Sequence, residues 1–301
     1  MINSAENLLR FSGHDTFHCK EQWLLKGVQL IDNEGSVDFF KKNDAIPILG
    51  VGKNMVRSIN HWLKSFGLIN NENEISKLSK LLFLEEKLDS YLENEGTLWL
   101  LHYNLCKTNY SSIYKLIFST YFSDKATLDF TEHQIINFIN RQLLSRHQKL
   151  VAGKTLNSDY KVFIRTYIPP SKNEKTIEDD FSAPLISLNL ISDTGRKNSV
   201  NQPVYRVNKD IQQSISAEVF AYCLIDEFSL ESSVSYEKIK QSIGNYFCLS
   251  NEGLELIIDK LCNSYSEFVF KDDAGVKQIQ FKNLNQKSKI DFLKKHYELQ
   301  Q

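Results

Sequence analysis

The residues with the clearest capacity for chemistry form a short string near the start of the chain. Gly13-His14-Asp15-Thr16-Phe17-His18 places two histidines four residues apart, with a carboxylate between them. On a helix, His14 and His18 would lie one turn apart, and together with Asp15 they can bind a divalent metal or supply a general base. No third ligand is evident, so structural hydrogen bonding is the alternative interpretation.

A second candidate centre lies in the middle of the chain. Asp159 and Lys161 open an alternating segment, and the acidic run Glu178-Asp179-Asp180 follows. On a strand, Asp159 and Lys161 project to the same side. There, carboxylates can hold Mg²⁺ or Mn²⁺ and activate a water for phosphodiester cleavage, with the lysine as a helper. A surface salt bridge at a strand end is the alternative, but as a catalytic group this centre ranks above the N-terminal string.

A basic helix face is the third pattern, and it predicts contact with DNA. From Lys53 to about Phe66 the apolar residues fall on one side of a helix, and Gly67 is typical of a helix end. The opposite side carries side chains that reach phosphates and base edges, namely Lys53, Asn54, Arg57, His61 and Lys64. A merely solvated basic face is the alternative.

The elements that must position these residues predict an α+β, mainly helical protein. A helix, a glycine turn at 50–52, a second helix, a glycine stop and a polar hairpin follow one another, which is the order of a winged helix-turn-helix. Residues 216–283 repeat that order and end in a hairpin at 268–281. Because the third helix of this C-terminal copy carries several acidic residues, we expect it to make structural or protein contacts.

We expect three domains. They are an N-terminal winged-helix domain at 1–105, a mixed α/β middle domain at 106–215 and a C-terminal winged-helix-like domain at 216–301. Finer patterns predict a helix over 12–31, a helix from a capping box at Thr131 and Gln134 to about Leu150, a strand over 160–168 and a loop over 194–203.

The composition is that of an ordinary globular protein and not of a basic nucleic-acid coat. Hydrophobic residues make up 42%, and 36 basic residues oppose 37 acidic ones, so any DNA surface must come from local charge segregation. Since no signal peptide or apolar run of about 18 residues is evident, we expect a cytoplasmic protein without membrane contact. Five cysteines without CxxC spacing fit reduced, buried thiols.

Several strings resemble a bacterial family known as a domain of unknown function. They are Phe11–Phe17, Trp23–Gly27, Leu49–Ser58, Trp62, Phe66–Ile69 and Tyr91–His102, with looser similarity over Ser158–Tyr167 and Glu178–Pro184. Members of that family lie beside sulfurtransferases similar to phosphoadenosine-phosphosulfate (PAPS) reductase and beside cysteine desulfurases. The chain resembles the SspB-type nicking component of DNA phosphorothioation and phage-defence systems.

This resemblance implies a DNA-binding component of such a system that nicks double-stranded DNA, with DNA and a PAPS-reductase-like sulfurtransferase as partners. It implies no particular catalytic residues. A metal-dependent nicking endonuclease would need Mg²⁺ or Mn²⁺. The alternatives are a non-enzymatic DNA-binding regulator, a targeting subunit for the sulfurtransferase, and a protein-interaction adaptor.

Overall fold

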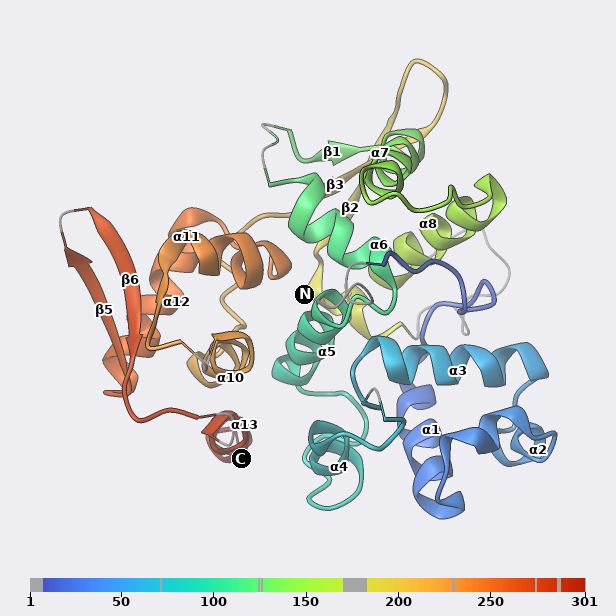
Figure 1. The fold of residues 1–301 in the computed structure, drawn as a ribbon, viewed down its shortest axis with the longest axis horizontal. Helices are drawn as coiled ribbons and strands as arrows, with labels where there is room; N and C mark the ends of the chain where they lie inside the picture. The colour runs from blue at the N-terminus through green and yellow to red at the C-terminus, as the bar shows by residue number, and fades with distance from the viewer. Residues whose placement is uncertain are drawn as a thin grey trace. The chain divides into compact units, whose positions relative to one another are not determined.

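The structure is a computed structural model of α+β class, with small antiparallel sheets (Figure 1). It describes residues 8–70, 72–123, 125, 127–169, 183–228, 231–273, 275–285 and 288–300. Two compact units divide the chain: unit 1 holds Met1–Glu93 and Asn104–Asn208, and unit 2 holds Asn94–Tyr103 and Lys209–Gln301. No helix among the described residues combines the length and apolar character that a bilayer crossing requires.

The first half of unit 1 is helical. Its elements are α1 (Glu21–Glu34), the 3₁₀-helix η1 (Val37–Lys41), α2 (Ala45–Leu49), α3 (Lys53–Ser65) and α4 (Lys77–Phe83). Helix α3 packs on α1 because Gly27 lets the two approach closely: a Cβ there would lie 2.8 Å from side-chain atoms of Ile59 and Leu63 (Figure 1). Gly67 ends α3 at φ +64°, as the sequence predicts.

The second half of unit 1 combines helices with a three-stranded sheet. The helices are the last residues of α5 (Glu95–Lys107), α6 (Ser112–Lys115), the π-helix η2 (Leu116–Tyr121), α7 (Glu132–Ser145), α8 (Gly153–Tyr167) and the 3₁₀-helix η3 (Pro184–Leu188). The strands are β1 (Asp129–Phe130), β2 (Ile191–Lys197) and β3 (Pro203–Val207), antiparallel in the order β1-β3-β2. The predicted capping box of Thr131 and Gln134 is confirmed at the start of α7.

Unit 2 contains the C-terminal helices and hairpin. Its elements after residue 209 are α10 (Ala217–Phe228), β4 (Ser233–Ser235), α11 (Tyr236–Ile239), the π-helix η4 (Lys240–Gly244), α12 (Asn251–Ser264), β5 (Phe268–Asp273), β6 (Val276–Phe281) and α13 (Ser288–Glu298). The strands form an antiparallel sheet in the order β4-β6-β5. The predicted hairpin at 268–281 is confirmed by β5 and β6, while the winged-helix assignment stays a prediction.

The predicted strand over 160–168 is wrong, because residues 160–167 form the C-terminal half of α8 and Ile168 is its C-cap. The buried positions Leu156, Tyr160, Phe163 and Tyr167 recur at helical spacing. Aromatic and β-branched residues alternate over 160–168, and this alternation is typical of a strand. The correction moves Asp159 and Lys161 to different faces, since residues two apart on a helix point about 200° apart.

Three further boundaries differ from the prediction. Helix α1 begins at Glu21, so the expected helix over 12–31 does not include residues 12–20. Helix α7 ends at Ser145, where His147 turns the chain at φ +54°. The expected loop over 194–203 is partly strand, because β2 continues to Lys197.

Candidate functional site

Helix α3 turns a polar, cationic side to solvent and an apolar side to the core. Lys53, Asn54 and Arg57 are exposed. The opposite side is buried and consists of Val56, Ile59, Trp62 and Leu63. His61 also belongs to the buried set, at 5% exposed, so it lies beneath the cationic side and not on it. Of the five residues predicted to touch DNA, the structure thus sets His61 apart from the others.

The loop over residues 12–16 is unusually strained. Ser12, Gly13, Asp15 and Thr16 all adopt positive φ angles, of 72°, 97°, 44° and 70°. Only glycine adopts such angles without cost, and clusters of them are typical of functional or tightly determined loops. Gly13 also lies directly against His61, because a Cβ on Gly13 would be 2.7 Å from His61 Nδ1. Consequently His14 and His18 do not form the predicted helical pair.

A buried carboxylate from α8 holds this loop. The backbone N–H of Ser12 donates to both oxygens of Asp159, at 2.9 and 3.0 Å. His14 Nε2 lies 3.2 Å from Asp159 Oδ1, although the two are not aligned as a hydrogen bond. Because Thr16 N–H donates to His14 Nδ1 at 3.2 Å, the imidazole proton belongs on the nitrogen that faces Asp159. His14 of the N-terminal candidate centre and Asp159 of the middle candidate centre therefore lie side by side in the folded chain.

The same loop contacts the cationic side of α3. Arg57 Nε donates to Asp15 Oδ2 at 2.7 Å, and an Arg57 terminal nitrogen donates to Asn54 Oδ1 at 2.8 Å. Asp15 is therefore engaged by an arginine and sits at the edge of the exposed surface. The contacts link Asp159 in the core to Arg57 at the surface through the loop.

His61 forms the buried floor under the loop. Its ring meets that of His14 edge-on, with centroids 5.7 Å apart, and its Nε2 lies 3.2 Å from Ser65 Oγ. Burial and the nearby His14 lower the pKa of His61 to about 3. The ring is neutral at physiological pH, so its part in the site is to support Gly13 and not to attract phosphate.

A cationic cavity of about 320 Å³ opens beside α3. Four basic residues line it, namely Lys41, Lys42, Lys53 and Arg57. Tyr110 lines it as well, and the Arg10 guanidinium lies over the Tyr110 ring at 5.4 Å from its centroid. No role was predicted for Lys41, Lys42, Arg10 or Tyr110, although the lysine pair lies only two residues before α2.

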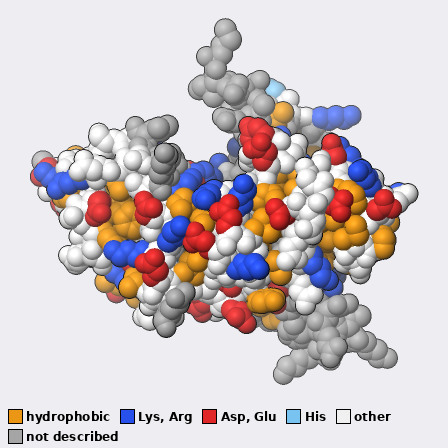
Figure 2. All heavy atoms as spheres, turned by 90° about the horizontal axis from the view of Figure 1, so that it is seen from below, with side chains coloured by type: hydrophobic (Ala, Val, Ile, Leu, Met, Phe, Trp, Pro, Cys, Tyr) orange, Lys and Arg blue, Asp and Glu red, His pale blue; other side chains and the backbone are white. Residues whose placement is uncertain are grey.

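The pKa of Lys64 reflects the positive electrostatic potential of this region. Partial burial lowers its pKa, the charges of Lys41 and Arg10 lower it further, and the Asp38 carboxylate opposes them without reversing the shift. Its Nζ donates to Asn73 Oδ1 at 2.8 Å, which holds the side chain at the end of α3. On the face drawn in Figure 2, by contrast, basic and acidic side chains are interspersed. Segregated positive charge is thus a local feature, as the near-zero net charge requires.

The remaining predicted catalytic residues do not join this site. Lys161 is exposed on α8, away from the buried Asp159. Glu178, Asp179 and Asp180 lie outside the described residues. Across the part of the chain that the structure describes, no three His, Cys, Asp or Glu side chains gather as metal ligands would.

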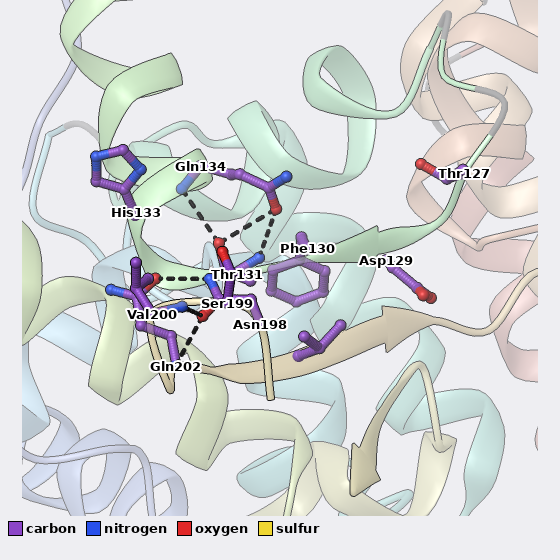
Figure 3. Close-up of a pocket in the computed structure, with 11 residues that line it drawn as sticks. Thr127, Asp129, Phe130, Thr131, His133, Gln134, Asn198, Ser199, Val200 and Gln202 are labelled. Carbon is purple, nitrogen blue, oxygen red and sulfur yellow. Dashed lines mark hydrogen bonds between the residues drawn. The ribbon is translucent and has the colours of Figure 1, made fainter. Parts of the chain in front are cut away.

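Another pocket, of about 670 Å³, lies between the start of α7 and the β2–β3 turn (Figure 3). Its polar groups serve local structure. Asn198 Oδ1 accepts from the N–H groups of Val200 and Gln202, which closes the turn. Asp129 pairs with Arg196 and Arg206 at 2.5 and 2.6 Å. This pocket therefore adds no candidate chemistry.

Comparisons with known proteins concern the whole chain. A family model described as "Protein of unknown function (DUF4007)" matches residues 11–297. A crystal structure of magnesium ion-bound SspB is similar with a TM-score of 0.82 and 21% identity, over 98% of this chain and 90% of that chain. A second SspB crystal structure is similar with a TM-score of 0.79 and 21% identity, over 96% and 88%. No curated protein matches significantly.

Proposed function

The chain belongs to the DUF4007 family, and we propose that it is a DNA-binding component of a DNA phosphorothioation system. The fold that it shares with SspB supports this link, together with the resemblance of its N-terminal strings to SspB-type proteins. Its substrate is then duplex DNA. A PAPS-reductase-like sulfurtransferase is the protein partner that such a system implies.

The cationic cavity beside α3 is the observation that carries DNA binding. Duplex DNA presents a phosphate charge every ~1.7 Å along its axis, and lysine or arginine contacts to these charges dominate affinity. Lys41 ends η1 and Lys42 follows it, while Lys53 and Arg57 lie on α3, so two adjacent elements offer cations to one backbone. We place α3 in the major groove, in the manner of a winged-helix reader, with Asn54 and Arg57 toward the base edges.

Nicking of one DNA strand is the activity we propose for the assembled site, on the strength of the likeness to SspB. The loop over 12–16 would lie next to the bound backbone, because Asp15 contacts Arg57. Asp159 and His14 are 1% and 3% exposed, so they act by holding the loop and not by touching DNA. Of the two carboxylates predicted in the N-terminal string and on α8, Asp15 is accessible to a substrate and Asp159 is not.

The residues described here do not fit a preassembled site for Mg²⁺ or Mn²⁺. Both oxygens of Asp159 already accept from Ser12, and no three-ligand group exists among the described side chains. This observation favours a second candidate function, a non-enzymatic subunit that targets the sulfurtransferase to DNA. Both functions share the same DNA surface.

Two measurements on the full chain test the proposal. Fluorescence anisotropy with a short DNA duplex should show binding that weakens steeply between about 50 and 200 mM salt. The absence of binding at low salt would overturn both candidates. Supercoiled plasmid incubated with and without Mg²⁺ or Mn²⁺ then separates them, since open circles indicate nicking and intact supercoils with DNA bound indicate the targeting subunit.

A further inference from the structure

A large cavity in unit 1 is separate from the surface around α3. It measures about 1080 Å³ and is walled by α8, the β2–β3 hairpin, η3 and the first residue of α7. A volume of roughly 300–1,000 Å³ is typical of sites for small organic ligands. The cavity is therefore large enough for a ligand with both a ring and a charged group.

Two cations that have no partner among the described residues lie along one wall of the cavity. Lys161 and Arg165 are exposed on successive turns of α8 and both line the cavity. Neither forms an ion pair or side-chain hydrogen bond with any residue that the structure describes. Since side chains four apart on a helix are neighbours, these two charges can hold one anionic group together.

Two buried polar atoms at the cavity also have no partner among the described residues. They are the hydroxyl of Tyr160, a residue only 4% exposed, and Oε1 of Glu132. Each such atom destabilises the folded protein unless it gains a hydrogen bond, and native proteins rarely leave one unsatisfied. Burial, Tyr205 and Glu132 raise the pKa of Tyr160, so its hydroxyl keeps the proton and can donate. The cavity thus offers a ligand one donor, the hydroxyl of Tyr160, and one acceptor, Oε1 of Glu132.

The remaining wall offers surfaces for a flat ring. Tyr205 on β3 is half-buried, and Ile164 and Ile186 add half-buried aliphatic surface. Aromatic side chains stack against nucleobases, and this stacking favours binding of every base because each has a flat π-face. Cations, a ring surface, a protonated hydroxyl and a carboxylate oxygen therefore surround one space.

We propose that this cavity binds one nucleotide unit. Lys161 and Arg165 would hold its phosphate, and the base would lie against Tyr205. Glu132 would accept from an exocyclic amino group while Tyr160 donates to a ring nitrogen, a pattern that adenine and cytosine present. The unit can come from a free mononucleotide or from a nucleotide turned out of a DNA strand.

Isothermal titration of the full chain with adenosine 5′-monophosphate tests the site without using the α3 surface. Saturable binding is expected, and it should weaken at least ~10-fold for ribose 5-phosphate, which lacks the base, and for adenosine, which lacks the phosphate. Equal binding of ribose 5-phosphate would overturn the base contact. Cytidine 5′-monophosphate should bind comparably.

Variants locate the binding in this cavity. Lys161→Ala should weaken the binding of adenosine 5′-monophosphate by about 10-fold. Tyr160→Phe, which removes only the hydroxyl, should weaken that binding by about 3- to 10-fold. Lys154→Ala is the matched control, because Lys154 is an exposed lysine of the same helix that does not line the cavity. Unchanged affinity in both Lys161→Ala and Tyr160→Phe would overturn the assignment.

A second arm identifies the source of the nucleotide. Single-stranded oligo(dA) is compared with an abasic strand of the same length, in the wild type and in Tyr160→Phe. A preference for oligo(dA) that Tyr160→Phe abolishes indicates a nucleotide of a strand, even where the free mononucleotide binds weakly. If neither the mononucleotides nor oligo(dA) bind in a way that depends on Lys161 or Tyr160, the proposal is wrong.

Discussion

His14 and Asp159 lie far apart in the sequence, yet His14 Nε2 is 3.2 Å from Asp159 Oδ1 in the core of unit 1. Both side chains are almost fully buried. Because Asp159 also accepts from Ser12, the contact fixes the loop whose Asp15 meets Arg57 on α3. His14 and Asp159 are residue types common in catalytic sites, but here they lie away from solvent and position a surface loop.

Asp159→Asn should destabilise the protein strongly. The asparagine keeps one acceptor oxygen, but its amide brings a donor to a place where the Ser12 N–H already donates and His14 Nε2 lies 3.2 Å from the carboxylate. A buried unmatched donor costs about 2–4 kcal/mol. Urea denaturation measures the free energy of unfolding. Asp32→Asn, an exposed change on α1, is the control and should change stability by less than ~0.5 kcal/mol. Equal losses in the two variants would contradict the role given to Asp159.

Gly13→Ala should cost more stability than Gly50→Ala. Both glycines have positive φ, of 97° and 68°, so alanine is strained at either position. Only at Gly13 would the new Cβ also press on His61, at 2.7 Å, whereas nothing lies within 4 Å at Gly50. We expect losses of about 2–3 kcal/mol and about 1 kcal/mol. Thermal denaturation compares them, and a larger loss at Gly50 would refute the tight loop.

Stability should fall as the pH is lowered from about 7 toward 4. The pKa of His61 is about 3 in the folded protein and near 6.5 when unfolded, so the unfolded state binds the extra proton first. The stabilisation is complete above pH ~6.5 and is lost as the pH falls toward the folded pKa. Burial lowers the pKa of His102 in unit 2 to about 4, which adds to the effect.

His61→Gln isolates the contribution of this histidine. The variant should be less stable at neutral pH, yet lose less on acidification, by roughly 1–2 kcal/mol between pH 7 and 5. Chemical denaturation at several pH values measures this slope. His133→Gln, an exposed histidine on α7, should leave the slope unchanged. A slope equal to the wild type in His61→Gln would show that His61 is not buried in its neutral form.

Asp15→Asn should strengthen binding to duplex DNA. The change removes a negative charge from the edge of the cationic cavity and frees Arg57 from its ion pair. Because exposed ion pairs are worth ~0–1 kcal/mol, the gain should be about 2- to 5-fold at low salt. Anisotropy titrations measure it. Weaker binding would mean that Asp15 orients Arg57 for DNA, and loss of plasmid nicking with tighter binding would assign Asp15 to the chemistry.

Strong local signals made much of the fold predictable. The apolar side of α3, the glycine that ends it and the capping box of α7 each depend on neighbouring residues, and all three are confirmed. Helix α8 was missed because its residues from Tyr160 onward alternate like a strand, and only the longer window from Leu156 shows helical spacing. The left-handed loop over 12–16 was missed because Ser, Asp and Thr rarely adopt positive φ without tertiary support.

The site was predictable only in part, because its decisive contacts join distant segments. The cationic side of α3 follows from helix periodicity, but the contribution of Lys41 and Lys42 depends on how η1 packs beside it. Whether Asp159 faces solvent or the core cannot be read from a local pattern that fits both a strand and a helix. For the same reason, the sequence alone does not predict that Asp159 lies beside His14.

The salt dependence of DNA binding by Lys53→Ala/Arg57→Ala tests the central claim most directly. Each phosphate contact contributes ~0.9 to the slope of log affinity against log salt, so losing two contacts should reduce that slope by about 2 and weaken binding at low salt. Lys26→Ala/Lys154→Ala removes two exposed lysines of unit 1 that do not line the cavity beside α3, and should keep the wild-type slope. Equal slopes in the wild type and Lys53→Ala/Arg57→Ala would contradict DNA binding through α3.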